Sequence, residues 1–280
     1  MGPVQRLKKD YPWIKTPLVV GAPMRLIALA DMAVEISRAG IGFINWGASL
    51  TASIPLIAAY RPAAVWFFAP SSLASLAEWA TQTRAASPET KIWVQVGSVA
   101  EALDAVRNVK PDVLVVQGTD AGGHGLVRGA SLIPLLPEIS DALRHPGGGG
   151  DGGEGEEGEA LKQDDTPVLL AAGGISDARG ACAALTLGAS GIVLGTRLLA
   201  ATEANISRGY QAEILRAQDG GQTTVRTKVY DQLRGTNWAE THNARGVVNR
   251  SYVDAVGGMD EEENRRLYEE EMGKGMRGGG

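Results

Sequence analysis

Short apolar runs that alternate with helical stretches constrain the fold of this chain more than any other feature. A strand followed repeatedly by a helix is typical of a parallel α/β architecture. The clearest run is VLVVQ at residues 113–117, bounded by Pro111 and Gly118. We interpret seven such runs as inner strands, at residues 17–23, 41–46, 64–69, 91–96, 113–117, 167–172 and 191–194. Helical spacing predicts helices at residues 28–39, 53–60, 73–86, 100–108, 132–143 and 177–187.

Length and composition favour one enzyme-sized domain and exclude several classes of partner. The chain has 280 residues, 44% of them hydrophobic, so one barrel-type domain is expected. Its net charge of -5 offers no basic face to a nucleic acid. The single cysteine, Cys182, excludes a disulfide framework and a cysteine-based zinc site, and we expect no metal. No apolar run reaches the ~20 residues of a membrane span, and residues 1–10 lack a secretory signal's apolar core, so we expect an intracellular, cytoplasmic protein with no membrane partner.

Two segments differ from the alternating pattern. Residues 146–165 (PGGGGDGGEGEEGEALKQDD) are glycine-rich and acidic, which predicts a flexible insertion; an acidic lid or metal-binding loop is the less common alternative. Residues 260–280 are charged, and Glu261 can pair with Arg265, and Glu262 with Arg266, one helical turn apart. The predicted organisation is an α/β barrel over residues 1–259, containing the insertion, and a charged C-terminal tail at 260–280.

The segment QGTDAGGHG at residues 117–125 follows an apolar strand directly. In an α/β barrel the carboxyl end of a strand belongs to the catalytic face. Glycines allow close approach of the backbone to a ligand, and His124 has the side chain expected of an acid or base near neutral pH. The alternative is a glycine-rich turn whose histidine only binds the backbone. His145 and His242 lie in polar stretches without such a setting, so His124 is the candidate catalytic residue.

Two further glycine turns lie between a strand and a helix. One contains Gly173 and Gly174, and the other contains Gly195 and Thr196. The N–H groups of a helix N-terminus suit a phosphate, and turns after the last two strands form the usual phosphate site of a barrel. Each glycine could also serve an ordinary tight turn, and Asp177 could simply cap its own helix.

A third turn, GAPM at residues 21–24, ends the first predicted strand. By itself this turn is consistent with a strand end followed by a core methionine. Only together with the other motifs does this turn become a candidate for the ligand site.

These motifs, in this order, resemble the nitronate monooxygenase family. The matching pieces are GAPM at 21–24, QGTDAGGHG at 117–125, the run from PVLLAAGGIS to LLAATEA at 167–204 and, more loosely, AGIGF at 39–43. The resemblance covers residues 16–240 approximately. It implies an FMN-binding barrel that oxidises alkyl nitronates with O₂ to a carbonyl compound and nitrite.

The resemblance also implies roles for individual residues. Those expected around FMN are Ala22, Pro23, Met24, Asn45, Gln117, Gly122, Gly123, Gly173, Gly174, Gly195 and Thr196. The first three would lie against the flavin, Asn45 would face it, and Gln117 and Gly122 would touch the ring or ribityl chain. The last four would hold the phosphate, and His124 would act as base or hydrogen-bond donor to the substrate. The expected partners are a small nitronate and O₂, with a homodimer as the candidate assembly.

The chain departs from the family at residues 40–47, where GIGFINWG joins the start of one family strand to the end of the next. Seven inner strands remain, whereas a barrel of this kind closes with eight. We therefore predict a TIM-type (β/α)₈ barrel with one β/α unit missing or fused near residues 40–47. The alternative functions are an FMN-dependent NAD(P)H reductase of the quinone or enoyl-thioester type, and a non-catalytic truncated barrel.

Overall fold

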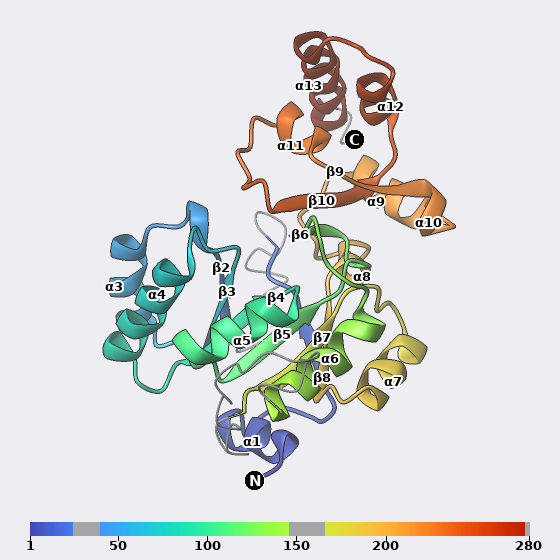
Figure 1. The fold of residues 1–280 in the computed structure, drawn as a ribbon. Helices are drawn as coiled ribbons and strands as arrows, with labels where there is room; N and C mark the ends of the chain where they lie inside the picture. The colour runs from blue at the N-terminus through green and yellow to red at the C-terminus, as the bar shows by residue number, and fades with distance from the viewer. Residues whose placement is uncertain (25–39, 146–165, 278–280) are drawn as a thin grey trace, which may run out of the picture.

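The computed structural model describes residues 1–24, 40–145 and 166–277 and centres on one parallel sheet (Figure 1). The order of its strands is β1-β8-β7-β5-β4-β3-β2, and every neighbouring pair is parallel. The strands are β1 (Leu18–Gly21), β2 (Gly40–Ile44), β3 (Ala64–Phe68), β4 (Lys91–Val96), β5 (Val113–Gln117), β7 (Val168–Ala172) and β8 (Gly191–Leu194). All seven predicted inner strands are confirmed. The predicted helix at 28–39 and the insertion at 146–165 lie outside the described residues.

The sheet is open between β1 and β2, its two edge strands. Among the described residues these strands share no ladder, although the turn after β1 reaches β2, where Pro23 lies directly against the Cα of Gly42. Both edges expose a large apolar side chain, Val19 at 56% and Ile41 at 41%. An eighth strand closes a barrel of this type. The prediction of a barrel that lacks one β/α unit is therefore confirmed.

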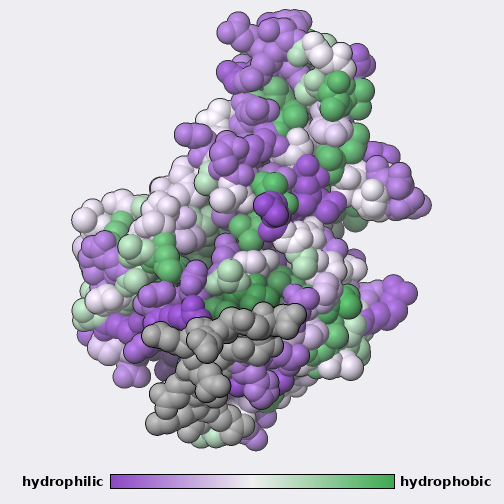
Figure 2. Space-filling model, viewed as in Figure 1, coloured by the Kyte–Doolittle hydropathy of each residue, from purple (hydrophilic) through white to green (hydrophobic). Residues whose placement is uncertain are grey.

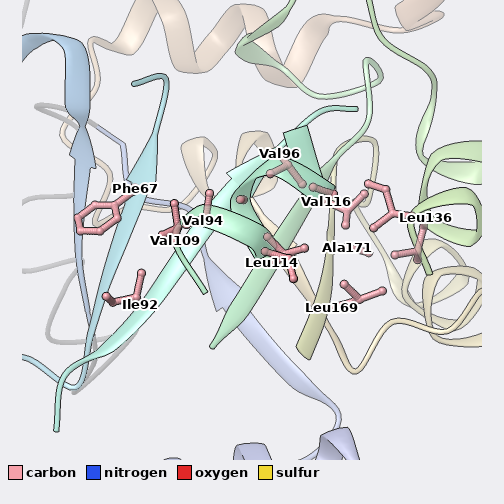
Figure 3. Packing of buried hydrophobic residues seen from close by; sticks show 14 of the residues in the cluster. Phe67, Ile92, Val94, Val96, Val109, Leu114, Val116, Leu136, Leu169 and Ala171 are labelled. Carbon is pink, nitrogen blue, oxygen red and sulfur yellow. The ribbon is translucent and has the colours of Figure 1, made fainter. Parts of the chain in front are cut away.

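Helices cover the outer face of the sheet, as predicted. They are α3 (Leu50–Tyr60), α4 (Leu73–Ala86), α5 (Val99–Asn108), α6 (Leu132–Arg144), α7 (Ala178–Thr186) and α8 (Thr196–Leu199). Side chains such as Phe67, Leu114 and Leu169 point from the strands into this layer and meet helix residues such as Leu136 (Figure 3). Burying one such side chain completely contributes roughly 1.5–3 kcal/mol to stability. This packing makes the sheet a rigid platform for the turns at its carboxyl end.

A helix that we did not predict from the sequence packs against the inner face of the sheet, at the N-terminal end of its strands. Helix α1 (Pro3–Asp10) contributes Leu7, and Tyr11 follows it; both are buried against the inner residues Trp93 and Leu170. The Nε1–H of Trp93 donates to the Tyr11 hydroxyl at 2.7 Å, and burial raises the pKa of Tyr11. Since α1 occupies the N-terminal end of the strands, a ligand can approach the inner face at the opposite end.

A second, antiparallel sheet lies above the carboxyl ends of the parallel strands (Figure 1). Its order is β6-β10-β9, formed by Gly123–Leu126, His242–Val247 and Thr224–Thr227. Around it lie α9 (Arg208–Arg216), α10 (Gly220–Thr223), α11 (Val229–Leu233), α12 (Arg250–Val256) and α13 (Glu261–Arg277). The glycine-rich segment around His124 is a strand at residues 123–126, because β10 pairs with it in an antiparallel ladder.

The charged C-terminal segment forms α13, so its predicted helix is confirmed. Glu261 accepts from Arg265 at 2.7 Å as predicted. The predicted pair of Glu262 with Arg266 is wrong, because Arg266 pairs instead with Glu263 and Glu270.

Figure 2 shows apolar side chains beside the hydrophilic helix α13. They lie in the region of α12, which exposes Val253 and Val256. None of the helices in the described ranges is long and apolar enough to cross a membrane.

Candidate active site

The turns after four parallel strands meet at the carboxyl edge of the sheet. The backbone N–H of Ala22 donates to Leu194 O at 2.8 Å, and that of Gly118 donates to Ala172 O at 3.0 Å. These bonds extend the β1–β8 and β5–β7 ladders one step beyond the strands. They bring together the turns expected to surround FMN, because all four begin at neighbouring strand ends.

The turn after β7 requires glycine for its backbone. Gly173 and Gly174 have φ of +104° and +69°, a region that L side chains rarely adopt. A Cβ on Gly173 would lie 3.0 Å from Gly118 O and 3.1 Å from Ala121 N, so the two turns are in close contact. The N–H of Gly174 makes no hydrogen bond within the described parts of the chain. An unpaired donor at this place is available to an anionic ligand.

The turn after β8 presents a second set of donors. Gly195 precedes α8, and Thr196 is its first residue, so the Thr196 N–H has no partner within the helix. The Thr196 side chain is exposed, and its Oγ1 lies directly against the Cα of Gly122 from the turn after β5. That hydroxyl has no hydrogen-bond partner among the residues described. The free donors of Gly174 and Thr196, on turns that both contact the turn after β5, fit a phosphate group.

The N-terminus of α7 contributes less to this site, because Asp177 caps it. Asp177 Oδ1 accepts from Arg179 N at 2.9 Å and from Gly180 N at 3.3 Å. The side-chain hydrogen bond from Arg179 and these backbone bonds lower the pKa of Asp177 to about 2. The capping alternative for Asp177 is confirmed, so the N-terminal N–H groups of Arg179 and Gly180 are already paired.

Asn45 lies in a short 3₁₀ turn, Asn45–Gly47, after β2 and is buried. Its Oδ1 accepts from the N–H of Phe68 at 2.9 Å, which fixes the amide. Its Nδ2 is also buried and has no partner within the described residues. Buried polar groups are nearly always paired, so this donor is suited to an acceptor on a bound ligand. The orphaned amide fits a flavin ring, whose carbonyl and nitrogen atoms accept hydrogen bonds.

The remaining cofactor candidates are divided between two places. Ala22 faces the β8 turn, with its Cβ 3.7 Å from the position of a Cβ on Gly195. Pro23 and Met24 continue toward β2. The Gln117 side chain instead contacts the small sheet, where its Nε2 donates to the backbone oxygen of His124 at 3.2 Å.

His124 is held by residues from a distant part of the chain. Its Nε2 lies 2.9 Å from Asp231 Oδ1 and 3.1 Å from Oδ2. Trp238 stacks on the imidazole, with ring centroids 3.8 Å apart and planes 11° from parallel. Trp238 therefore covers one face of the imidazole ring. The histidine is fixed in orientation rather than mobile in a loop.

Sequence reasoning missed His242, which lies on β10 beside His124. It is buried, its Nδ1 lies 3.0 Å from Thr241 Oγ1, and its ring meets Phe68 edge-on. Burial, followed by the positive charges of His124, Arg226 and Lys228, lowers the pKa of His242 to about 4. The residue is therefore neutral at neutral pH. Residues 242 and 244 are buried and residue 243 is less so, which is the alternation of a strand with one buried face. The sequence HNA shows this alternation only weakly.

A small cavity of about 20 Å³, room for about one water molecule, lies between the small sheet and the ends of β3, β4 and β5. Its lining includes Phe68, Gln95, Gln117, Leu126 and His242. Glu101 also reaches it, accepts from Gly97 N at 2.7 Å, and has a pKa raised by burial. The walls of this cavity are both apolar and hydrogen-bonding.

Two arginines of the small sheet, also missed by sequence reasoning, tie it to the turn after β5. Arg245 donates to Thr119 O at 3.1 Å, and Arg226 donates to Thr119 O and Ala121 O at 3.4 Å. Burial and the neighbouring Arg245 lower the pKa of Arg226. These bonds fix the backbone that leads from Gln117 to His124. No cluster of histidine, cysteine and carboxylate side chains in the described ranges could hold a metal ion.

The fold and the site define a class: an open parallel α/β barrel with phosphate-type glycine turns and a histidine at its carboxyl face. The model of the family described as nitronate monooxygenase matches residues 71–259. A nitronate monooxygenase of Metarhizium robertsii, npaC, is 40% identical over 99% of this chain and 85% of its own length. One of Neurospora crassa is 32% identical over 96% of this chain and 83% of its own length. The chain belongs to the nitronate monooxygenase family.

Solved structures agree on the fold. FabK from Thermotoga maritima has a TM-score of 0.64 at 19% identity, covering 97% of this chain and 83% of its own. A nitroalkane oxidase from Streptomyces ansochromogenes has a TM-score of 0.53 at 20% identity, covering 89% of this chain and 57% of its own. Identities this low show the fold alone.

The alignment with the Metarhizium relative runs over 322 residues, whereas this chain has 280. At least 42 positions of that alignment therefore have no counterpart here. A complete βαβ unit takes about 30 residues or more. The difference in length is large enough for the β/α unit that the open sheet lacks.

Proposed function

We propose that this chain binds FMN at the carboxyl face of the open barrel and oxidises alkyl nitronates with O₂ to a carbonyl compound and nitrite. The observation that carries the proposal is the pair of unpaired donors, Gly174 N–H and Thr196 Oγ1, at two turns that both contact the turn after β5, in a member of this family. FMN, when bound, supplies the redox chemistry. The chain supplies binding, orientation and proton handling.

The phosphate of FMN is held by backbone N–H groups of Gly173, Gly174, Gly195 and Thr196, together with the Thr196 hydroxyl. Support comes from the N–H of Gly174 and the Oγ1 of Thr196, which have no hydrogen-bond partner among the described residues and lie at turns that both contact the turn after β5. FMN fits better than a dinucleotide because no G-x-G-x-x-G sequence follows the first strand.

The residues that would hold the flavin ring are Ala22, Pro23 and Met24 after β1, and Gly122 and Gly123 after β5. The buried Nδ2 of Asn45 donates to a ring acceptor, which satisfies an otherwise orphaned group. Gln117 acts through its hydrogen bond to the His124 backbone and orients β6 beside the ring.

His124 handles the proton of the substrate. With a neutral nitroalkane it takes the proton from the carbon beside the nitro group, and the protonated imidazole then donates a hydrogen bond to an oxygen of the nitronate. Imidazole suits both tasks near neutral pH. The neutral His242 adjoins it without adding a second positive charge.

The experiment that tests this function starts with the purified full chain. Its absorption spectrum should show flavin bands, and heat should release FMN that chromatography identifies. Adding a nitronate in air should consume O₂ and produce nitrite. Rapid bleaching of the flavin by NAD(P)H, without nitrite from a nitronate, would favour the reductase. Absence of flavin after reconstitution would favour the non-catalytic truncated barrel.

We further propose a cytoplasmic homodimer whose barrel domain ends near residue 259. The exposed side chain of Cys182, the one cysteine of the sequence, suits a reducing compartment. Cell fractionation measures the compartment, and light scattering after size-exclusion chromatography measures the assembly.

A further inference from the structure

Asp231 is a buried carboxylate that the proposed function does not yet use. It lies on α11, far in sequence from His124, and is 3% exposed. Both oxygens face the Nε2 of His124, and Oδ1 also accepts from the Thr236 hydroxyl at 3.1 Å. Within the described ranges no lysine or arginine pairs with it; the nearby Lys228 pairs with Glu240 at 2.8 Å. His124 is thus its counter-ion candidate.

The hydrogen-bond inventory of these groups determines where the proton of His124 resides. An ionised carboxylate only accepts, so the Nε2 that faces it must carry a hydrogen. A neutral imidazole has one N–H, which leaves Nδ1 as an unprotonated acceptor. The Nδ1 of His124 makes no hydrogen bond to any described residue. Asp231 therefore selects the tautomer in which Nδ1 is free to take a proton.

A second contact fixes the plane of the ring. Trp238 stacks on His124 with planes 11° apart, and it follows α11 by five residues. Thr236, between them, donates its backbone N–H to Asp231 O at 2.9 Å. One short segment thus fixes both the rotation and the tautomer of His124. Orientation by a hydrogen-bonded carboxylate is what a histidine base needs to be effective.

We propose that Asp231 is the positioning residue that keeps His124 protonated on Nε2, so that Nδ1 acts as the base toward a neutral nitroalkane. In the step the bond from the α-carbon to hydrogen breaks, the electron pair moves toward the nitro group to form the nitronate, and the proton goes to Nδ1. The Asp231 carboxylate stabilises the resulting imidazolium. This inference rests on the proposed function, and it adds the residue that prepares the base.

The first arm of the test is the Asp231→Asn variant. An asparagine can donate to Nε2 and so favour the tautomer with the proton on Nδ1. The same kind of change in a Ser-His-Asp triad lowers kcat about 10⁴-fold. With a neutral nitroalkane kcat/KM should fall ~10²–10⁴-fold, while turnover of a pre-ionised nitronate and the FMN content remain nearly unchanged. Asp219→Asn is the matched control, because Asp219 lies exposed in the same sheet region and its side chain makes no hydrogen bond to a described residue.

The second arm does not depend on turnover. Long-range ¹H–¹⁵N spectra of the ¹⁵N-labelled holoenzyme report the protonated nitrogen of each histidine, and the chain has 3. His124, assigned by its loss in His124→Asn, should carry its hydrogen on Nε2, and Asp231→Asn should move it to Nδ1. A hydrogen on Nδ1 in the unmodified protein, or equal losses with both substrate forms in Asp231→Asn, overturns the proposal. If neither substrate form is turned over by the unmodified protein, the proposed function fails and the spectra still decide the role of Asp231.

Discussion

The parallel sheet and the small antiparallel sheet hold different parts of the site. The parallel sheet presents the glycine turns and Asn45, which fit a cofactor, whereas the small sheet presents His124, fixed by Asp231 from α11. The two meet across a cavity lined by both. Under the proposed function, cofactor binding and proton transfer would therefore belong to separate structural units. Their losses should be separable by substitution, and each prediction below tests that separation.

The largest expected effect is the loss of turnover when His124 of the small sheet is replaced. The variant His124→Asn should retain FMN, because the phosphate donors lie on the parallel sheet. Turnover of a neutral nitroalkane should fall ~10²–10⁴-fold, as for loss of a positioned base. A pre-ionised nitronate needs no proton abstraction and should suffer less. Oxygen consumption is measured with each substrate form, and the flavin spectrum gives the FMN content. If the variant oxidises both forms at the rate of the unmodified protein, His124 is not catalytic.

The complementary change is Gly173→Ala on the parallel sheet. A Cβ there meets Gly118 O at 3.0 Å with φ at +104°, and such strain costs roughly 1–3 kcal/mol. The affinity for FMN should fall about tenfold or more, since 1.4 kcal/mol is a factor of ten. Fluorescence titration of the apoprotein with FMN gives the affinity, and turnover per bound flavin should be preserved.

Gly209→Ala is the control for that variant. Gly209 lies in α9, and a Cβ there meets nothing within 4 Å. Alanine in a helix favours folding, so FMN affinity should stay unchanged. If Gly173→Ala binds FMN as tightly as this control does, the turn after β7 is not the phosphate site.

Restoring the missing β/α unit tests the open edge of the parallel sheet. Inserting the corresponding segment of the Metarhizium relative within residues 40–47 would cover Val19 and Ile41, which are now 56% and 41% exposed. Covering each contributes on the order of 1 kcal/mol, which raises Tm by roughly 2–4 °C per kcal/mol in a domain of this size. Thermal melts and flavin content compare the two versions. Equal melting temperatures and equal flavin content would show that the seven-stranded sheet closes adequately without the unit.

The two sheets also differ in how well the sequence predicts them. Strands such as residues 91–96 and 113–117 match their predicted limits, because a strand buried on both faces is a continuous apolar run. β6 has the sequence GHGL and carries no strand propensity of its own; it is a strand because β10 pairs with it. The glycine turns could be located from their order along the chain. Asp231 could not be connected with His124, since only the tertiary fold brings them together.

The smallest expected effect concerns His242, which lies where the two sheets meet. Its pKa of about 4 in the folded protein lies below the ordinary value near 6.5, so the unfolded chain binds more protons between these pH values. Stability contributed by the neutral residue is therefore present above pH ~6.5 and is lost as the pH falls toward 4. Between pH 7 and pH 5 we expect this residue to remove about 1–2 kcal/mol of unfolding free energy, and His242→Leu should abolish that part. Urea unfolding of both proteins at the two pH values measures the difference. The same pH dependence in both would mean that His242 stays hydrated and that the two sheets are less tightly joined than its burial indicates.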